Sequence, residues 1–298
     1  MNGLFKVLGI TKQSFHQMLK RRRYKFEEQE QLIPLINEIR RDHPRMSARD
    51  IYLKLQPGCM GRDQFERFCI DSGYRIKKLR NFRVTTNSLG VTRFPNMIKD
   101  LEVTRVNQVF VSDITYFDLG PDTRYLTFIM DLYNREIVGY SESDNLRTEN
   151  TTIPALYRVI KERGKANLKG AIMHSDGGGQ YYCNEFKALT KELGMINSMT
   201  EEKVYENAHA ERLNGIIKNN YLYPYGPTNV TSLKKLLDKA VFMYNTGKPH
   251  KALGKLTPSM FRSTIDNENN SPSYLPLSTV NNNNNKRGKL SIKKVNVI

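Results

Sequence analysis

The chain of 298 residues has no tryptophan, only three cysteines and no long apolar run. Cys59, Cys69 and Cys183 stand at spacings that fit neither a disulfide framework nor a zinc site, so we expect free thiols in a cytoplasmic protein. A membrane span needs about 18 consecutive apolar residues, and no such run occurs. The first residues also lack the apolar segment of a secretory signal. These absences argue against membrane and secreted proteins.

Acidic residues are scarce at both ends of the chain. Residues 1–100 carry 21 Lys and Arg against 10 Asp and Glu, and residues 271–298 carry 5 basic residues and no acid. Residues 101–270 are nearly balanced, with 21 basic and 20 acidic residues. A near-neutral centre with basic ends indicates a catalytic body with nucleic-acid-binding appendages. A generally basic, solvated surface would give the same net charge of +17, and charge alone does not separate the two.

Residues 1–80 are predicted to be helical. Thr11 is a suitable N-cap for a helix that runs into a block of four cations, and a separate helical unit is expected around residues 32–39, where Pro34 argues against a regular first turn. Further helices are expected after Ser47 and Gly61. This spacing is typical of helix-turn-helix DNA-binding regions, although a small helical bundle without a nucleic-acid role gives the same pattern. The four cations, candidate DNA contacts, are Lys20, Arg21, Arg22 and Arg23.

The rest of the chain divides into a linker, a core and a tail. Residues 81–97 contain several basic and small polar residues but no acid, so we expect a linker that could follow a phosphate backbone. Residues 98–264 form the predicted core. Residues 265–298 are mostly polar, with an asparagine run and basic residues, and are expected to be a disordered tail that binds DNA without sequence preference.

The core is predicted to be an α/β domain. β-rich segments at 109–117, 125–132 and 136–142 should form an antiparallel meander, with a turn at Gly120 and Pro121. Helical patterns then alternate with short apolar strands. This order predicts a mixed sheet of about five strands flanked by helices.

Three acidic residues of the core stand in unusual contexts. Asp113 lies within an apolar strand, where an unpaired carboxylate is costly. Asp176 follows the short strand at 170–175 and precedes three glycines, which allow close approach of a phosphate. Glu211 lies on a predicted helix, on one face with Asn214 and Lys218.

Three carboxylates brought together could hold two Mg²⁺ ions about 3.5–4 Å apart, the arrangement that supports phosphoryl transfer on DNA. Mn²⁺ could substitute. Taken singly, Asp113 could cap a turn, Asp176 could be a loop acid and Glu211 an exposed helix residue. The context of all three favours a shared site.

Four blocks of the sequence resemble a known family. They are Asp113-Ile-Thr-Tyr116, His174-Ser-Asp-Gly-Gly-Gly-Gln-Tyr181, the segment from Asn207 to Lys218, and the segment from Tyr244 to Leu253. Together they resemble the signature blocks of bacterial insertion-sequence transposases, in particular the second-frame product, OrfB, of the group encoded in two overlapping frames. The core is similar to that of retroviral integrases. The resemblance covers about residues 4–262.

The resemblance implies an RNase H-like fold preceded by an all-α helix-turn-helix region. It makes Asp113, Asp176 and Glu211 the DDE triad, catalytic and metal-binding, and makes Lys218 a contact to the element's end. It also implies double-stranded DNA as partner and a first-frame OrfA partner. Because two DNA ends must be paired, the chemistry leads us to expect a homo-oligomer on DNA, and we expect the protein at the nucleoid. The usual tryptophan of the first block is replaced by Phe110.

Other side chains of these blocks have two interpretations. Arg212, Asn214 and His174 are candidate DNA contacts, although for His174 simple packing is the commoner role. His209 and His250 are structural or DNA-facing, since no ligand spacing supports zinc. The tyrosines at 221, 223 and 225 could stack on bases or form a packed turn.

The sequence thus predicts a transposase that cleaves DNA and transfers its strands by two-metal phosphoryl transfer. Two alternatives stay open, namely an RNase H-like nuclease without strand transfer and a catalytically silent DNA-binding protein.

Overall fold

The computed structural model describes residues 9, 11–76, 94–201 and 207–270. The chain divides into two compact units, Met1–Lys78 and Leu79–Ile298. In the described parts of both units, no helix has the length and apolar character needed to cross a membrane. Most of the predicted linker and residues 271–298 of the predicted tail lie outside the described residues.

The first unit begins with α2 (Lys12–Asp42), which Thr11 caps as predicted: its Oγ1 accepts a hydrogen bond from the Ser14 backbone N–H at 3.0 Å. The predicted interruption near Pro34 is wrong, because α2 continues through this residue as one helix. Leu32 and Ile36 on either side of Pro34 are buried in the core of the unit. Their packing offsets the lost backbone hydrogen bond.

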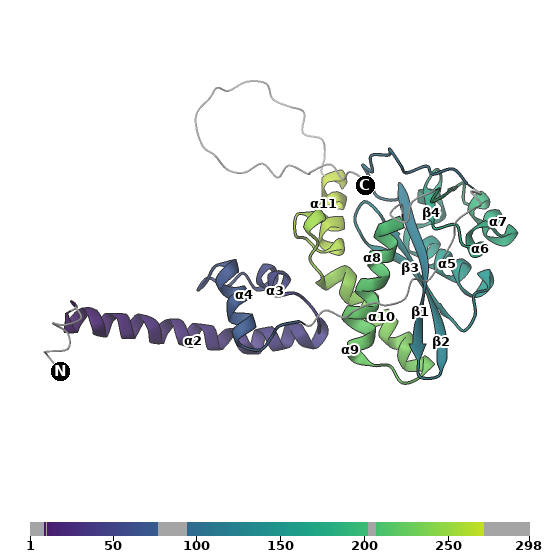
Figure 1. Ribbon diagram of the computed structural model, residues 1–298. Helices are drawn as coiled ribbons and strands as arrows, with labels where there is room; N and C mark the ends of the chain where they lie inside the picture. The colour runs from purple at the N-terminus through teal and green to yellow at the C-terminus, as the bar shows by residue number, and fades with distance from the viewer. Residues whose placement is uncertain (1–8, 10, 77–93, 202–206, 271–298) are drawn as a thin grey trace, which may run out of the picture. The chain divides into compact units, whose positions relative to one another are not determined.

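Helices α3 (Ala48–Leu55) and α4 (Arg62–Asp71) complete the first unit. Ser47 caps α3 by accepting the Asp50 backbone N–H at 3.1 Å. The apolar core contains Ile51 and Phe65 together with Leu32 and Ile36 of α2. The N-terminal half of α2 extends beyond α3 and α4 (Figure 1), and the four predicted DNA contacts at 20–23 are exposed on it.

The second unit is built on a five-stranded sheet of β1 (Val109–Leu119), β2 (Asp122–Asp131), β3 (Ile137–Ser143), β4 (Ile172–Ser175) and β5 (Ile196–Met199), in the order β3-β2-β1-β4-β5. β1, β2 and β3 pair antiparallel, which confirms the predicted meander. β4 pairs parallel to β1, and β5 pairs parallel to β4. The sheet is therefore mixed, as predicted. β5 was not identified individually, because two of its four residues are polar.

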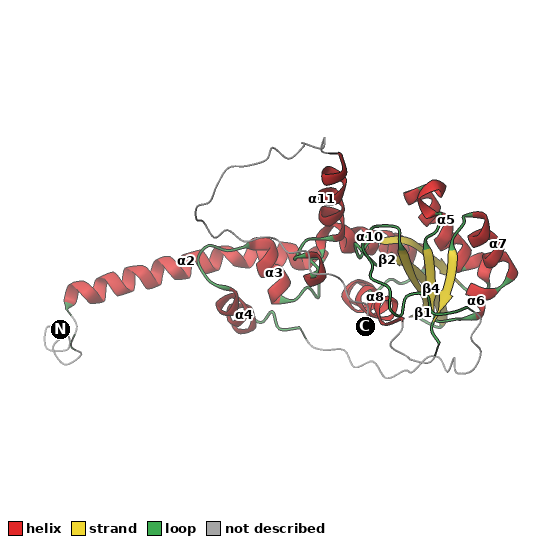
Figure 2. Cartoon of the chain, turned by 90° about the horizontal axis from the view of Figure 1, so that it is seen from above, coloured by secondary structure: helices red, strands yellow, loops and turns green. Residues whose placement is uncertain are grey.

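Helices cover both faces of the sheet (Figure 2). On one face lie α5 (Thr152–Arg163), α6 (Gly179–Tyr182) and α7 (Asn184–Glu192); on the other lie α8 (Ala208–Ile217) and α10 (Val230–Gly247). Side chains of β1 alternate between the two cores: Phe110 packs with α5, whereas Val109 and Val111 pack with α8 and α10. Asp113, two residues after Val111, therefore belongs to the α8 face.

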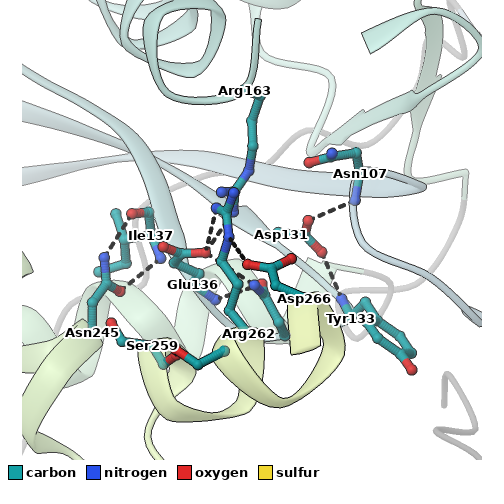
Figure 3. A network of polar contacts seen from close by, with 12 residues as sticks. Asn107, Asp131, Tyr133, Glu136, Ile137, Arg163, Asn245, Ser259, Arg262 and Asp266 are labelled. Atoms are coloured by element: carbon teal, nitrogen blue, oxygen red, sulfur yellow. Dashed lines mark hydrogen bonds and ion pairs between the residues drawn. The ribbon is translucent and has the colours of Figure 1, made fainter. Parts of the chain in front are cut away.

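A polar network attaches α11 (Pro258–Asn270) to the sheet (Figure 3). Glu136 accepts hydrogen bonds from Arg163 of α5 at 2.6 Å and from Arg262 of α11 at 3.4 Å. Arg262 also lies 3.6 Å from the Asp266 carboxylate. The predicted disordered tail starts at 265, whereas α11 continues to Asn270, so the helix extends past that boundary.

The close approach of β3 and α5 at Gly139 yields a stability prediction. A Cβ at this position would lie 2.4 Å from the Ala155 carbonyl oxygen and 2.7 Å from Val159 Cγ2. We expect Gly139→Ala to lower the free energy of unfolding by about 1–3 kcal/mol, measured by urea denaturation. Gly179→Ala is the control, since its Cβ would meet its nearest neighbour at an ordinary 3.6 Å. Equal stability of the two variants would contradict this packing.

Candidate functional site: three carboxylates on the α8 face

Asp113 lies in the middle of β1, opposite Phe128 of β2, and is half-buried. Its Oδ1 accepts the Ile114 backbone N–H at 2.9 Å, and its Oδ2 accepts the Asn214 side-chain amide of α8 at 2.8 Å. Two donors thus hold the carboxylate in one orientation.

Three side chains fasten α8 and the turn that follows it to β1. Asn207 donates to the Ser112 carbonyl oxygen at 2.9 Å, Asn214 binds Asp113, and Lys218 donates to Thr115 Oγ1 at 2.7 Å. The spacing of residues 207, 211, 214 and 218 puts them on one stripe of a helix. Glu211 therefore stands between two of these contacts, on the β1 side of α8, with its side chain exposed.

Asp176 follows the last residue of β4. Because β4 pairs parallel to β1 with His174 opposite Val111, Asp176 and Asp113 stand at the same height in the sheet. The Asp176 Oδ1 accepts the Gly178 backbone N–H at 3.0 Å. Gly177 has a φ of +77°, in the left-handed region that favours glycine.

The three carboxylates influence one another electrostatically. Burial, followed by the charges of Asp176 and Glu211, raises the pKa of Asp113 to about 8. Burial raises the pKa of Asp176, and burial together with the charge of Asp176 raises the pKa of Glu211. In the described residues, no Lys or Arg forms an ion pair with any of the three.

The three acids lie close enough to influence one another electrostatically, but in the described residues they do not form a preformed metal-binding site. Across residues 11–76, 94–201 and 207–270, no group of three His, Cys, Asp or Glu side chains is arranged to hold a metal ion. The metal-ligand set of Asp113, Asp176 and Glu211 stays a prediction.

Two of the predicted DNA contacts are contradicted by their burial. His174 is fully buried in β4, with its Nδ1 2.9 Å from Ser198 Oγ, so it packs inside the sheet. Asn214 is only 5% exposed and orients Asp113. Both side chains lie level with the acids along the strands. For this reason their positions in the motifs suggested contacts to DNA.

The remaining candidates have different surroundings. Lys218 is half-buried and also donates to the Tyr116 carbonyl oxygen at 3.2 Å, so in this conformation it supports β1. Arg212 is exposed on α8, and its DNA contact stays a prediction, as it does for Lys20, Arg21, Arg22 and Arg23. Tyr221 is fully buried in the π-helical turn η4 (Lys218–Leu222), so the packed-turn interpretation holds for it.

Two residues were not singled out from the sequence. Asn207 fastens the start of α8 to β1. The sequence feature that could have identified it is its position seven residues before Asn214, which puts both residues on one face of a helix. Arg135, in the turn between β2 and β3, contacts His209 of α8 at 2.9 Å. No periodicity of the sequence points to Arg135, because its partner lies 74 residues away.

Comparison with known proteins assigns the second unit. Two family profiles, both described as an integrase core domain, match residues 103–203 and 196–258. A 31 kDa protein of insertion element IS600 from Shigella sonnei, itself uncharacterized, is 32% identical over 207 residues, which cover 68% of this chain and 75% of that protein. The transposase of insertion sequence element IS904 from Lactococcus lactis is 26% identical over 170 residues, 56% of this chain and 66% of its own.

Solved structures give a weaker likeness. The catalytic core domain of HTLV-2 integrase, solved in complex with magnesium, matches 52% of this chain and 96% of its own with 21% identity and a TM-score of 0.43.

The family matches cover the segments that carry Asp113, Asp176 and Glu211. Proteins with this core act on DNA and generally use divalent metal ions. The family matches and the relatives agree on one assignment. The chain belongs to the bacterial insertion-sequence transposases with a DDE integrase core, enzymes that transfer polynucleotide strands.

Proposed function

We propose that this transposase cuts the ends of its insertion sequence and joins them to target DNA at a site formed by Asp113, Asp176 and Glu211. The observation that supports this proposal is the mutual influence of these carboxylates on the α8 face, where burial and the charges of its two neighbours raise the pKa of Asp113 to about 8. Carboxylates in such a position repel one another and are stabilised by a bound cation.

The residues fit Mg²⁺, with Mn²⁺ as a substitute, because these ions prefer carboxylate oxygens and complete their shell with water and phosphate oxygens. Asp113, Asp176 and Glu211 would hold two such ions. When bound, the ions would activate the attacking oxygen and stabilise the leaving one.

The chain's own groups would provide the positioning. Asn214 and the Ile114 N–H hold the Asp113 carboxylate, and the Gly178 N–H holds Asp176. The glycines at 177–179 leave the backbone open to a phosphate. A water molecule would attack the phosphodiester at the element's end in line and release a DNA 3′-hydroxyl. That 3′-hydroxyl would then attack a phosphodiester of the target DNA in line and displace the 3′-oxygen of the target strand. No covalent link between protein and DNA is needed, since the 3′-end is itself the second nucleophile.

The proposed partners follow from this chemistry. Joining an element to a target requires both of its ends in one complex, so we propose a homo-oligomer on double-stranded DNA in the cytoplasm, at the nucleoid. The exposed cations at 20–23 on α2 would contact the DNA backbone. A first-frame OrfA partner would add further DNA-reading helices.

Removing any one carboxylate should stop the chemistry. We expect Asp113→Asn, Asp176→Asn and Glu211→Gln each to reduce strand transfer to less than about 1% of wild type, because charge stabilisation at the reacting phosphate is lost. The assay uses end-labelled oligonucleotides with Mg²⁺, and DNA affinity should change little.

Asp118→Asn is the control, since this acid is exposed on the same strand. A triad variant with normal joining activity would refute the assignment. A wild-type chain that nicks without joining would support the nuclease alternative.

The raised pKa of Asp113 predicts a pH-dependent stability. A folded pKa of about 8 against 3.8 means that the metal-free folded state holds its proton more tightly, so its stability falls as pH rises from about 4 to 8. Asp113→Asn removes this loss. We expect the variant to melt several degrees above wild type at pH 8.5 in EDTA, with a smaller difference at pH 5; each kcal/mol corresponds to about 2–4 °C.

Mg²⁺ or Mn²⁺ should raise the melting temperature of wild type at pH 8.5 and leave that of Asp113→Asn nearly unchanged, because a ligand that binds only the folded state stabilises it. Asp118→Asn should behave as wild type in both experiments. Equal responses of wild type and Asp113→Asn to the ions would mean that Asp113 is not a ligand.

A further inference from the structure

Ser112, the neighbour of Asp113 on β1, is a fully buried polar residue. Its two oxygens are bonded to the segments that carry the other two acids. The Ser112 carbonyl oxygen accepts the Asn207 side-chain amide at 2.9 Å, and Asn207 lies one helical turn before Glu211. The Ser112 Oγ lies 2.8 Å from the Tyr181 hydroxyl, on the segment that follows Asp176. One buried residue therefore connects all three parts of the site.

The hydroxyl groups of this connection have a defined direction. Ser112 Oγ donates to the Phe128 carbonyl oxygen at 2.9 Å. A serine hydroxyl has a single proton, so the Tyr181 hydroxyl must be the donor to Ser112 Oγ. Phe128 is the residue of β2 that pairs with Asp113. The hydrogen-bonded chain thus runs from Tyr181 through Ser112 to the strand position opposite the first acid.

Tyr181 lies within α6, five residues after Asp176, and is only 3% exposed. Its ring packs edge-on against Phe186 of α7, with the ring centroids 5.5 Å apart. Burial, followed by the charges of Asp176 and Asp113, raises the pKa of Tyr181 well above its ordinary value. The hydroxyl therefore stays protonated and serves as a permanent donor to Ser112.

Backbone pairing alone does not fix the segment that carries Asp176. The parallel pairing of β4 with β1 ends at His174 and Val111. The glycines at 177–179 then give the backbone more freedom than other residues would. The Tyr181 hydroxyl binds β1 beyond the last paired residue, so it limits where Asp176 can stand relative to Asp113.

We propose that Ser112 and Tyr181 are positioning residues that set the spacing of Asp113, Asp176 and Glu211 for divalent metal ions. This inference rests on the proposed function, because it takes the three acids as the metal ligands. Both side chains are buried, so they act through the acids and do not touch DNA. Groups that orient metal ligands by hydrogen bonds typically contribute about 10–100-fold to metal affinity or activity.

The test is Tyr181→Phe, which removes the hydroxyl and keeps the ring that packs on Phe186. The melting temperature of the full chain is titrated with Mn²⁺, so that ion binding is measured without catalysis. We expect the Mn²⁺ concentration that gives half of the maximal shift to rise about tenfold. Ser112→Ala should change it in the same direction. Because both variants remove the same hydrogen bond, the double variant should differ little from the more affected single one.

Two matched variants separate positioning from a loss of stability. Tyr140→Phe removes a hydroxyl that donates to the Asp238 carboxylate at 2.7 Å, and Ser141→Ala removes one that donates to the Thr151 carbonyl oxygen at 2.6 Å. Both should melt below wild type in EDTA and keep the wild-type Mn²⁺ midpoint. A wild-type midpoint in Tyr181→Phe and Ser112→Ala would overturn the proposal, as would an equal change of midpoint in the two matched variants.

Strand transfer provides a second readout. With saturating DNA, joining by Tyr181→Phe should require about tenfold more Mg²⁺, approach the wild-type rate at high Mg²⁺ and show an unchanged KM for DNA. A group that acts on the reacting atoms would not be compensated by additional metal. A joining defect that persists at every Mg²⁺ concentration would therefore contradict a positioning role.

The titrations also distinguish this inference from the proposed function. If Mn²⁺ shifts the melting of wild type and Asp113→Asn equally, the metal-binding triad itself fails. If wild type responds to Mn²⁺, Asp113→Asn does not, and Tyr181→Phe has the wild-type midpoint, only the positioning role fails.

Discussion

The structure depends on a carboxylate held inside a sheet. Asp113 stands in β1 with apolar neighbours, and burial raises its pKa to about 8. It is tolerated because the Ile114 N–H and the Asn214 amide bind its two oxygens. Asn214 must reach it from another element, so α8 has to lie along β1, and Asn207 and Lys218 secure that position. The buried Asp113 carboxylate needs the Asn214 donor, so α8 is fixed along β1. Glu211 is on the same helix, and its position is fixed with it.

The order of the strands in the sheet positions the third acid, Asp176. β1 and β4 are adjacent and parallel although a meander and a helix separate them in sequence, and this pairing brings the end of β4 level with Asp113. Two apolar cores on opposite faces keep the sheet rigid, so the acids share one side of it. The glycines after Asp176 leave that side open. A rigid support with an open edge suits an enzyme whose catalysis consists mainly of positioning.

Local patterns predicted much of this fold, because they depend on neighbours in the chain. Thr11 and Ser47 cap helices by binding backbone three residues on, and the meander follows from alternating strands and a turn. Sequence patterns gave wrong predictions where contacts between residues far apart in the chain determine the structure. Pro34 stays within α2 because the core packs around it. His174 and Asn214 are buried rather than DNA-facing, since their partners Ser198 and Asp113 come from other strands.

By itself the sequence determined the class of the protein: three acids in distinctive blocks, an α/β core and basic ends, all of which are properties of residue types and short spacings. Tertiary structure alone decided which side chains meet. It brought Asp176 level with Asp113 across a parallel pairing, placed Asn214 on the Asp113 carboxylate, and buried Arg135 against His209. The reason is physical, since the charge environment of a side chain is set by residues close in space, and Asp113 and Asn214, for example, lie 101 positions apart in the chain.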